Sequence, residues 1–194
     1  LSQNAGADAY NTAVGYDVGR NVTTGVQNTL IGAKAGDALT TGAYNTVLGY
    51  SALSSEDTGG RSTAIGYFAL SQQNNDSDNY NVAIGHSAGE SVTTGTNNTL
   101  IGGLAGDALT TGQYNVALGY NALSAEDDYG KNIAIGVNAL AVQDAGVDAY
   151  NVAIGYNVGD AISTGVRNTL IGGGHTGTAL TTGSYNVAVG YGAL

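Results

Sequence analysis

The sequence predicts an all-β protein, a parallel β-solenoid with ~17-residue coils. A five-residue unit, Asn-(Thr/Val/Ile)-(Ala/Leu/Val)-(Ile/Val/Leu)-Gly, occurs eleven times, and Ser62 is the one start that is not Asn. The steps between successive unit starts are 17, 17, 17, 19, 17, 17, 17, 19, 17 and 18. The order of steps recurs, so a longer, 70-residue period overlies the short one. A repeat this regular indicates one supersecondary unit stacked on copies of itself, and residues 1–194 are expected to form a single continuous solenoid.

The five-residue unit is expected to contain the strand of each coil. Counted from the Asn as position 1, position 4 is always aliphatic and position 2 is always Thr, Val or Ile. Alternate residues of a strand share a face, so we expect positions 2 and 4 to form the internal core. Position 3 is never polar, and a strand that is apolar on both faces is usually buried on both. We therefore expect position 3 at a contact between subunits; the alternative is that its Ala and Leu line a wider internal core.

Two further positions of the unit have a predicted structural role. The Asn side chains are expected to form a ladder of hydrogen bonds between neighbouring coils. The glycine at position 5 is expected to allow a bend or a positive φ at a corner. The asparagines are Asn11, Asn28, Asn45, Asn81, Asn98, Asn115, Asn132, Asn151, Asn168 and Asn186. The glycines are Gly15, Gly32, Gly49, Gly66, Gly85, Gly102, Gly119, Gly136, Gly155, Gly172 and Gly190.

The rest of each coil follows one of two designs. A second short strand is expected around position 8, which is typically Ala. Some coils then have Gly at position 9 and a large aliphatic near position 12, as in residues 36–42. The others have Leu at position 9 and a polar continuation that is often acidic, as in residues 53–57 and 123–128. Each design supplies one large aliphatic side chain, so we expect the two to fill the same part of the core.

The residue before each unit alternates between aromatic and polar types. Such a stripe can pack over the turns, which is the preferred interpretation, or its exposed rings can stack on sugars. The aromatic members are Tyr10, Tyr44, Tyr80, Tyr114, Tyr150 and Tyr185, and the residues between them are Gln27, Arg61, Asn97, Lys131 and Arg167.

Composition narrows the classes of partner. The chain has 15 acidic and 5 basic residues and a net charge of −10, which argues against nucleic acid and against anionic membrane surfaces. No apolar run is long enough to suggest insertion into a membrane. Residues 1–10 resemble the end of a coil, and Leu194 stands where Leu53 and Leu123 stand in theirs. The rod is therefore expected to continue beyond both ends.

The repeated motifs resemble those of two families of fibrous proteins. Asn-Val-Ala-Ile-Gly and Asn-Thr-Ala-Val-Gly-Tyr are similar to the head repeats of trimeric autotransporter adhesins and to the shaft repeats of bacteriophage tail fibres, and residues 44–53 and 114–123 are closest to the fibre type. The resemblance implies a left-handed parallel β-roll, a homotrimer, an extracellular or virion location and a role in attachment. The coils here are longer than those typical of adhesin heads, and the 70-residue period is not part of that pattern.

Motifs for catalysis or cofactor binding are few. Residues 172–177 match the Gly-x-Gly-x-x-Gly pattern of dinucleotide-binding proteins, but they lie within a solenoid coil and not in a βαβ unit. His86 and His175 are five coils apart, so within one chain they cannot share a metal. Without Cys or paired His, no nucleophilic triad is expected. Clustered carboxylates can bind calcium, and the candidates are Glu56, Asp57, Glu126, Asp127 and Asp128.

These observations favour a structural and adhesive fibre segment. We expect no catalytic residue and no cofactor, and a cell-surface glycan or receptor as the partner. The first alternative is an ice-binding solenoid. Its Thr pairs are missing from two successive coils between Thr41 and Thr93, which counts against an unbroken ice-binding array. The second alternative is a fibre domain that degrades polysaccharide, for which two carboxylates would have to flank a glycosidic bond.

Overall fold

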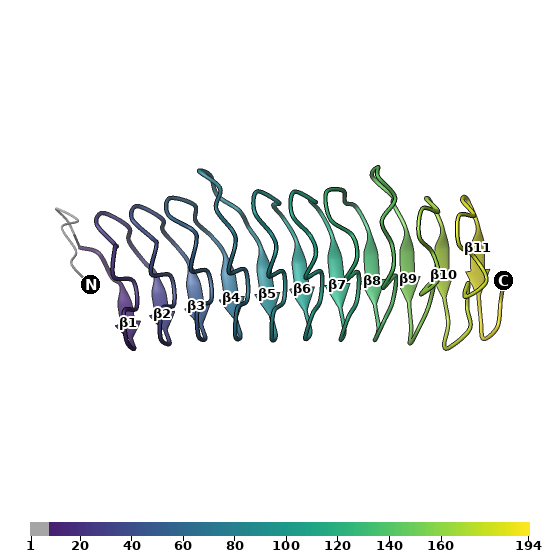
Figure 1. Ribbon diagram of the computed structural model, residues 1–194, viewed down its shortest axis with the longest axis horizontal. Helices are drawn as coiled ribbons and strands as arrows, with labels where there is room; N and C mark the ends of the chain where they lie inside the picture. The colour runs from purple at the N-terminus through teal and green to yellow at the C-terminus, as the bar shows by residue number, and fades with distance from the viewer. Residues whose placement is uncertain (1–7) are drawn as a thin grey trace.

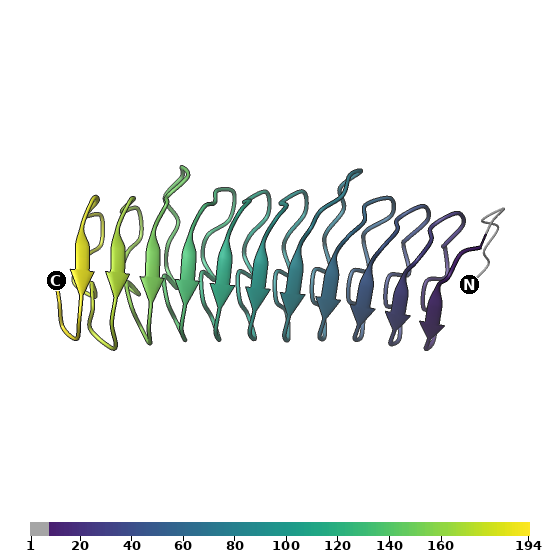
Figure 2. The same cartoon turned by 180° about the vertical axis from the view of Figure 1, so that it is seen from behind.

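The computed structural model describes residues 8–194, so most of the predicted first half-coil lies outside the described residues. Eleven strands form one sheet in chain order (Figures 1 and 2). The strands are β1 (Thr12–Val14), β2 (Thr29–Ile31), β3 (Thr46–Leu48), β4 (Thr63–Ile65), β5 (Val82–Ile84), β6 (Thr99–Ile101), β7 (Val116–Leu118), β8 (Ile133–Ile135), β9 (Val152–Ile154), β10 (Thr169–Ile171) and β11 (Val187–Val189). Every neighbouring pair is parallel. The predicted parallel β-solenoid is confirmed; its left-handed sense stays a prediction.

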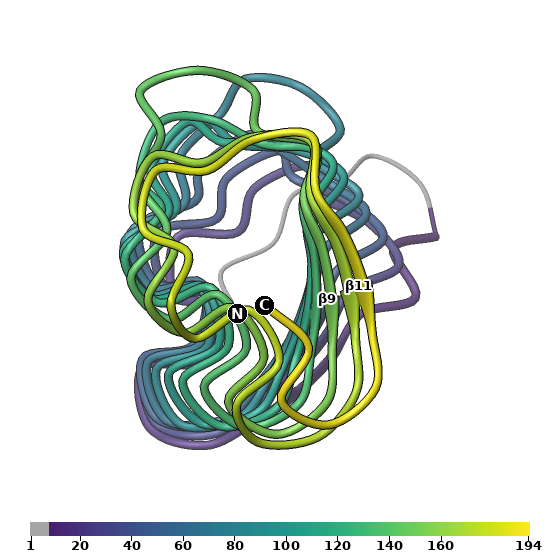
Figure 3. The same ribbon diagram turned by 90° about the vertical axis from the view of Figure 1, so that its right-hand side faces the viewer.

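The coils stack into a rod whose strands all lie on one side. Ten steps between strands, at about 4.8 Å each, give a sheet about 48 Å long. Two loops rise above the others in Figure 1, after β4 and after β8, and both project from the rod in the end-on view of Figure 3. They belong to the two longest coils, residues 62–80 and 132–150. Within residues 8–194 no helix is long and apolar enough to cross a membrane.

The prediction for the two strand faces was wrong. Position 3 points into the coil: Leu100 and Ala117 are fully buried, and all position 3 residues from Leu30 to Ala188 belong to the core. No residue at position 2 or position 4 is buried. Alternation correctly predicted that positions 2 and 4 share a face. It could not predict which of the two faces lies inside the coil. Lysine at Ala83 or Ala117 would therefore disrupt the coil interior and would not test a subunit contact.

The opposite wall of the coil is made of turns, so the second strand expected around position 8 is not formed. Its Ala side chains still point inward, as Ala105 and Ala122 show. The large aliphatic side chains of both coil designs are fully buried, as expected: Leu109 represents position 12 and Leu123 position 9. Leu123 has a φ of 52°, a left-handed conformation that its counterpart Gly106 adopts without strain.

The predicted asparagine ladder is present. The Oδ1 atom of Asn98 accepts a hydrogen bond from the backbone N–H of Asn115 at 3.0 Å, and its Nδ2 atom donates to the Gly112 carbonyl at 2.8 Å. The first bond recurs between neighbouring coils and is missing where Ser62 replaces Asn. The side chains thus bond mainly to backbone groups, and they satisfy buried polar groups that the short strands leave unpaired.

The glycines at position 5 are required by the backbone. Gly102 has a φ of 136°, and a Cβ atom on it would lie 2.3 Å from the Gly119 carbonyl oxygen of the next coil. The other members of this column have φ between 113° and 145°, except Gly172, which lies beside the one-residue insertion of its coil. The predicted corner with positive φ is confirmed for ten of the eleven glycines.

Candidate functional site

One regular surface of the rod is the solvent side of the sheet, which we call the outward face. It consists of the position 2 and position 4 side chains of all eleven strands, and every one of them is Thr, Val, Ile or Leu. Leu48 is 44% exposed and Leu118 is 41% exposed. The face carries no charge along its whole length. A continuous apolar strip of this kind is unusual on a soluble monomer and typically marks an interaction surface.

A second regular feature is the column of tyrosines and polar residues before each unit, which we call the tyrosine column. Its rings are exposed, and the basic residues between them lie against them. The Arg61 guanidinium is 4.6 Å from the Tyr44 ring centroid and 5.8 Å from that of Tyr80. Arg167 lies between Tyr150 and Tyr185 in the same way. Four of the six rings, those of Tyr44, Tyr80, Tyr150 and Tyr185, therefore lie against a basic side chain of a neighbouring coil, and they remain largely exposed.

The basic residues of the tyrosine column also form ion pairs. The Nε atom of Arg61 donates to Asp78 at 2.6 Å, and Lys131 pairs with Asp148. Each acid lies one coil further along the chain than its basic partner. Hydrogen bonds to these carboxylates are the largest cause of the raised pKa values of Arg61 and Lys131. Arg61 is exposed and Lys131 is half-buried, so solvent screens both pairs and they contribute little to the stability of the fold.

A groove of about 250 Å³ opens beside the tyrosine column. It is lined by residues that include Tyr114, Tyr129, Gln113 and Asp128, with the ion pair of Lys131 at its edge. Tyr114 is 56% exposed and Tyr129 is 38% exposed. Exposed aromatic rings beside amide and carboxylate groups are chemically suited to a sugar, because the rings stack on C–H faces and the polar groups bond to hydroxyls.

The groups that line this groove are not repeated 70 residues earlier in the chain, in what we call the first 70-residue unit. The positions that correspond to Gln113, Asp128 and Tyr129 hold Ala43, Thr58 and Gly59. The sequence alone did not single out Tyr129, because it lies outside the repeated unit. A comparison of equivalent positions in the two 70-residue units would have found it.

Both histidines are exposed on the turns, as expected. The His86 ring stacks on Tyr67 at 5.2 Å between centroids, and Tyr67 stacks in turn on Tyr50 at 5.5 Å. His175 contacts Tyr191 edge to face, far along the chain from His86. Residues 172–177 lie in the turn after β10, and no helix follows them, so they lack the structure of a dinucleotide site.

The five calcium candidates divide into three environments. Glu56 is buried and accepts hydrogen bonds from Gly59 N at 2.8 Å, Gln73 Nε2 at 3.0 Å and Asn79 Nδ2 at 2.9 Å. Burial raises its pKa and these bonds lower it. Asp57, the next residue, contributes its backbone carbonyl as an acceptor for Thr40.

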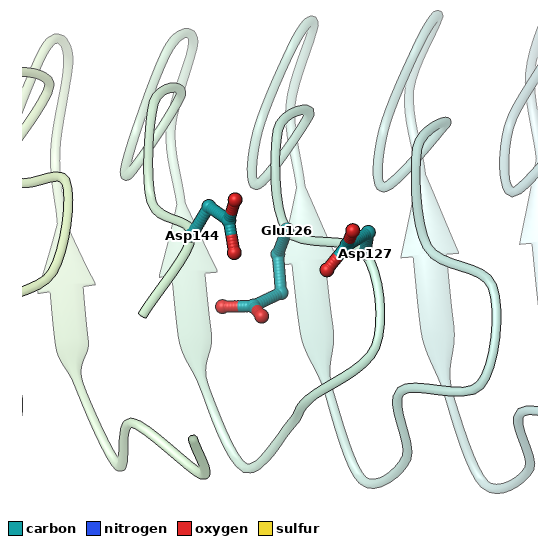
Figure 4. A group of neighbouring side chains, drawn as sticks. All are labelled: Glu126, Asp127 and Asp144. Atoms are coloured by element: carbon teal, nitrogen blue, oxygen red, sulfur yellow. The ribbon is translucent and has the colours of Figure 1, made fainter. Parts of the chain in front are cut away.

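Asp128 accepts hydrogen bonds from the hydroxyls of Thr110 and Thr111 on the preceding coil, so it points away from the other acids of its segment. Glu126 and Asp127 do come together, with Asp144 as a third acid from the next coil (Figure 4). Sequence reasoning missed Asp144. Its spacing from Asp127 was the available signal, because the two residues are one coil length apart in the chain.

Burial of Glu126 raises its pKa from 4.5 to about 7, with smaller contributions from the negative charges of Asp144 and Asp127. The carboxylate is fully buried and its Oε1 atom has no hydrogen-bond partner.

Comparison with family models, with curated proteins and with solved structures finds no match for this chain. The resemblance to adhesin heads and tail-fibre shafts therefore depends on the repeated motifs alone. The fold itself, a β-solenoid repeat protein, follows from the structure.

Proposed function

We propose that this chain is a structural and adhesive segment of an attachment fibre outside the cell or on a virion. In this proposal it acts as a homotrimer, binds a glycan or receptor through its turns, and carries out no catalysis. The observation that supports it most directly is the outward face, an uncharged strip of apolar and Thr side chains that runs the length of the rod.

A second copy of the chain is the partner that suits this face. Its side chains repeat at the strand spacing of about 4.8 Å over all eleven strands. A partner that covers the whole face must match this repeat over the same length without burying unpaired charge, and another copy of the same face meets these conditions. Burial of such a strip is favourable at roughly 25 cal/mol per Å² of apolar area. A closed cyclic assembly, here a trimer as the resemblance implies, covers the face in every copy.

The turns stay free for recognition when the outward faces are covered. The tyrosine column and the groove near Tyr114 lie outside the outward face, and several copies in one fibre would add weak contacts into a stronger one. The double substitution Gln113→Ala with Tyr129→Gly gives the groove the residues found at positions 43 and 59. It should abolish binding of the protein to a glycan array. Unchanged binding by this variant would contradict the role of the groove, and turnover of a polysaccharide would contradict the non-enzymatic role.

The oligomeric state tests the central claim. Light scattering should give a mass of about 58 kDa, three times the 19.3 kDa of one chain. Leu48→Lys with Leu118→Lys should shift the protein to monomers, because each substitution would bury unpaired charge at a contact. The matched control is Thr24→Lys with Thr94→Lys, which adds the same charge on exposed turns. A wild-type monomer at high concentration contradicts the proposal.

Ice binding is a second candidate, and one observation favours it. The Thr pairs lie on the turns, but the outward face is regular and unbroken over eleven strands, with Thr at position 2 of β1 to β4. In this case the face must be free in a monomer. Inhibition of ice recrystallisation by dilute monomeric protein, lost in the Leu48→Lys and Leu118→Lys variant, would favour this function over the fibre.

A further inference from the structure

The acidic group of Figure 4 can be compared with the equivalent residues 70 positions earlier in the same chain. Glu126 and Asp127 correspond to Glu56 and Asp57. Asp144 corresponds to Asn74, and Ala149 corresponds to Asn79. Compared with the first unit, the second unit therefore has Ala149 in place of the amide of Asn79, and the carboxylate of Asp144 in place of the amide of Asn74. The glutamates themselves, Glu56 and Glu126, are both fully buried.

Two side-chain donors that hold Glu56 are missing around Glu126, one because the residue differs and one because the same residue type points elsewhere. Asn79 donates to Glu56 at 2.9 Å, and Ala149 offers no such group. The Gln143 amide donates to the Ser163 carbonyl at 3.2 Å, whereas its counterpart Gln73 donates to Glu56.

Glu126 retains one side-chain donor. The Nδ2 atom of Asn132 lies 3.3 Å from Glu126 Oε2, and the buried Oε1 atom has no partner. A buried carboxylate oxygen without a donor is costly and requires an explanation.

The second unit also adds negative charge where it removes donors. One carboxylate oxygen from each of Glu126, Asp127 and Asp144 lies within 4.8 Å of the other two. Figure 4 shows the three side chains converging from two neighbouring coils, Glu126 and Asp127 from one and Asp144 from the next. Three clustered carboxylates repel one another, and a cation would offset both the repulsion and the unpartnered oxygen.

We propose that Glu126, Asp127 and Asp144 bind a divalent cation, with calcium preferred. Calcium takes oxygen ligands at 2.3–2.6 Å, so two oxygens on one ion stand at most about 5 Å apart, which accommodates the 4.8 Å limit of this group. Magnesium binds oxygens at about 2.1 Å and requires a near-ideal octahedral geometry, whereas calcium accepts a more flexible set of oxygen ligands. Glu126 binds from the buried side, and Asp144 is exposed, so water can complete the coordination.

A bound ion would connect two coils of the rod. Glu126 and Asp127 precede β8, and Asp144 lies in the projecting loop between β8 and β9. The loop is longer than in the standard coil and contains no other carboxylate until Asp148, which pairs with Lys131. Since the ion binds the folded rod, it should stabilise this region by an amount that rises with the logarithm of its concentration once that exceeds the dissociation constant.

The test is calcium titration of the chelator-treated full chain by calorimetry, with terbium luminescence excited through tyrosine as a second readout. We expect one saturable site per chain and a weaker response to magnesium. Asp144→Asn restores the residue of the first unit and should weaken calcium binding more than tenfold, as should Glu126→Gln. Glu56→Gln is the matched control and should leave the calcium affinity unchanged.

The reverse exchange tests whether the same residues suffice. Asn74→Asp with Asn79→Ala gives the first unit the residues of the second, and we expect two calcium ions per chain. Equal calcium affinity in the wild type and in folded Asp144→Asn would overturn the proposal. So would the lack of a saturable site in the wild type. Circular dichroism checks that each variant keeps its β structure.

Discussion

Replacement of Asn98 by Ala tests how much the asparagine ladder contributes to the fold. Asn98 lies in the middle of the rod and is fully buried. Its side chain makes the two bonds described above, to Asn115 N at 3.0 Å and to the Gly112 carbonyl at 2.8 Å. Alanine removes both partners at once, and each buried backbone group left without one costs about 1–3 kcal/mol. We therefore expect the free energy of unfolding to fall by about 2–6 kcal/mol.

Chemical denaturation at fixed chain concentration measures the total loss, and hydrogen exchange locates it. The amide of Asn115 should lose protection first, because its acceptor is gone. Asn11→Ala is the matched control. Asn11 makes the same two bonds, at 2.7 and 2.8 Å, but is only half-buried at the end of the rod. Water can replace its groups there, so we expect a loss below about 1 kcal/mol.

Asn98→Asp separates the two bonds. It keeps an acceptor for the Asn115 N–H but removes the donor and sets a carboxylate against the Gly112 carbonyl. A loss below about 1 kcal/mol for Asn98→Ala, with unchanged protection at Asn115, would refute the view that the ladder supports the fold.

Three further predictions concern the core, the corners and the buried acid. Leu100→Ala should lower the free energy of unfolding by about 2–5 kcal/mol, because Leu100 is fully buried. In a monomer, Ile101→Ala on the outward face should lower it much less. Chemical denaturation measures both losses, and a larger loss for Ile101→Ala would contradict the assignment of the two faces. Gly102→Ala should prevent cooperative folding or cost several kcal/mol, because its Cβ would lie 2.3 Å from a backbone oxygen; thermal melting checks this. In chelator, the contribution of Glu126 should favour folding most below pH 4.5 and be lost as the pH rises through about 7, since the folded carboxyl holds a proton that the unfolded one releases. The stability of the wild type relative to Glu126→Gln should thus fall by about 3 kcal/mol between pH 4 and pH 8, and a flat difference contradicts the raised pKa.

The candidate site was only partly visible in the sequence. Glu126 and Asp127 are adjacent in the chain and were recognised as a pair of acids. Asp144 joins them because one full coil returns the chain to the same angular position. Glu126 also lacks the glutamine donor that Glu56 has, because Gln143 bonds to the Ser163 carbonyl of the next coil, and the sequence alone does not show this side-chain orientation.

The sequence by itself determined the repeat, the solenoid, the asparagine ladder and the glycine corners. Each depends on one residue type at one phase, so the short period is enough to predict them. Only the tertiary structure decided which strand face is inside. Both faces are apolar, and alternation cannot choose between them. The coil closes over the position 3 column, where Leu100 and Ala117 meet the aliphatic side chains of the turns, and the branched residues Val116 and Ile101 face outward. The strand face left exposed to solvent is therefore the one opposite to the face predicted, because the coil closes over position 3.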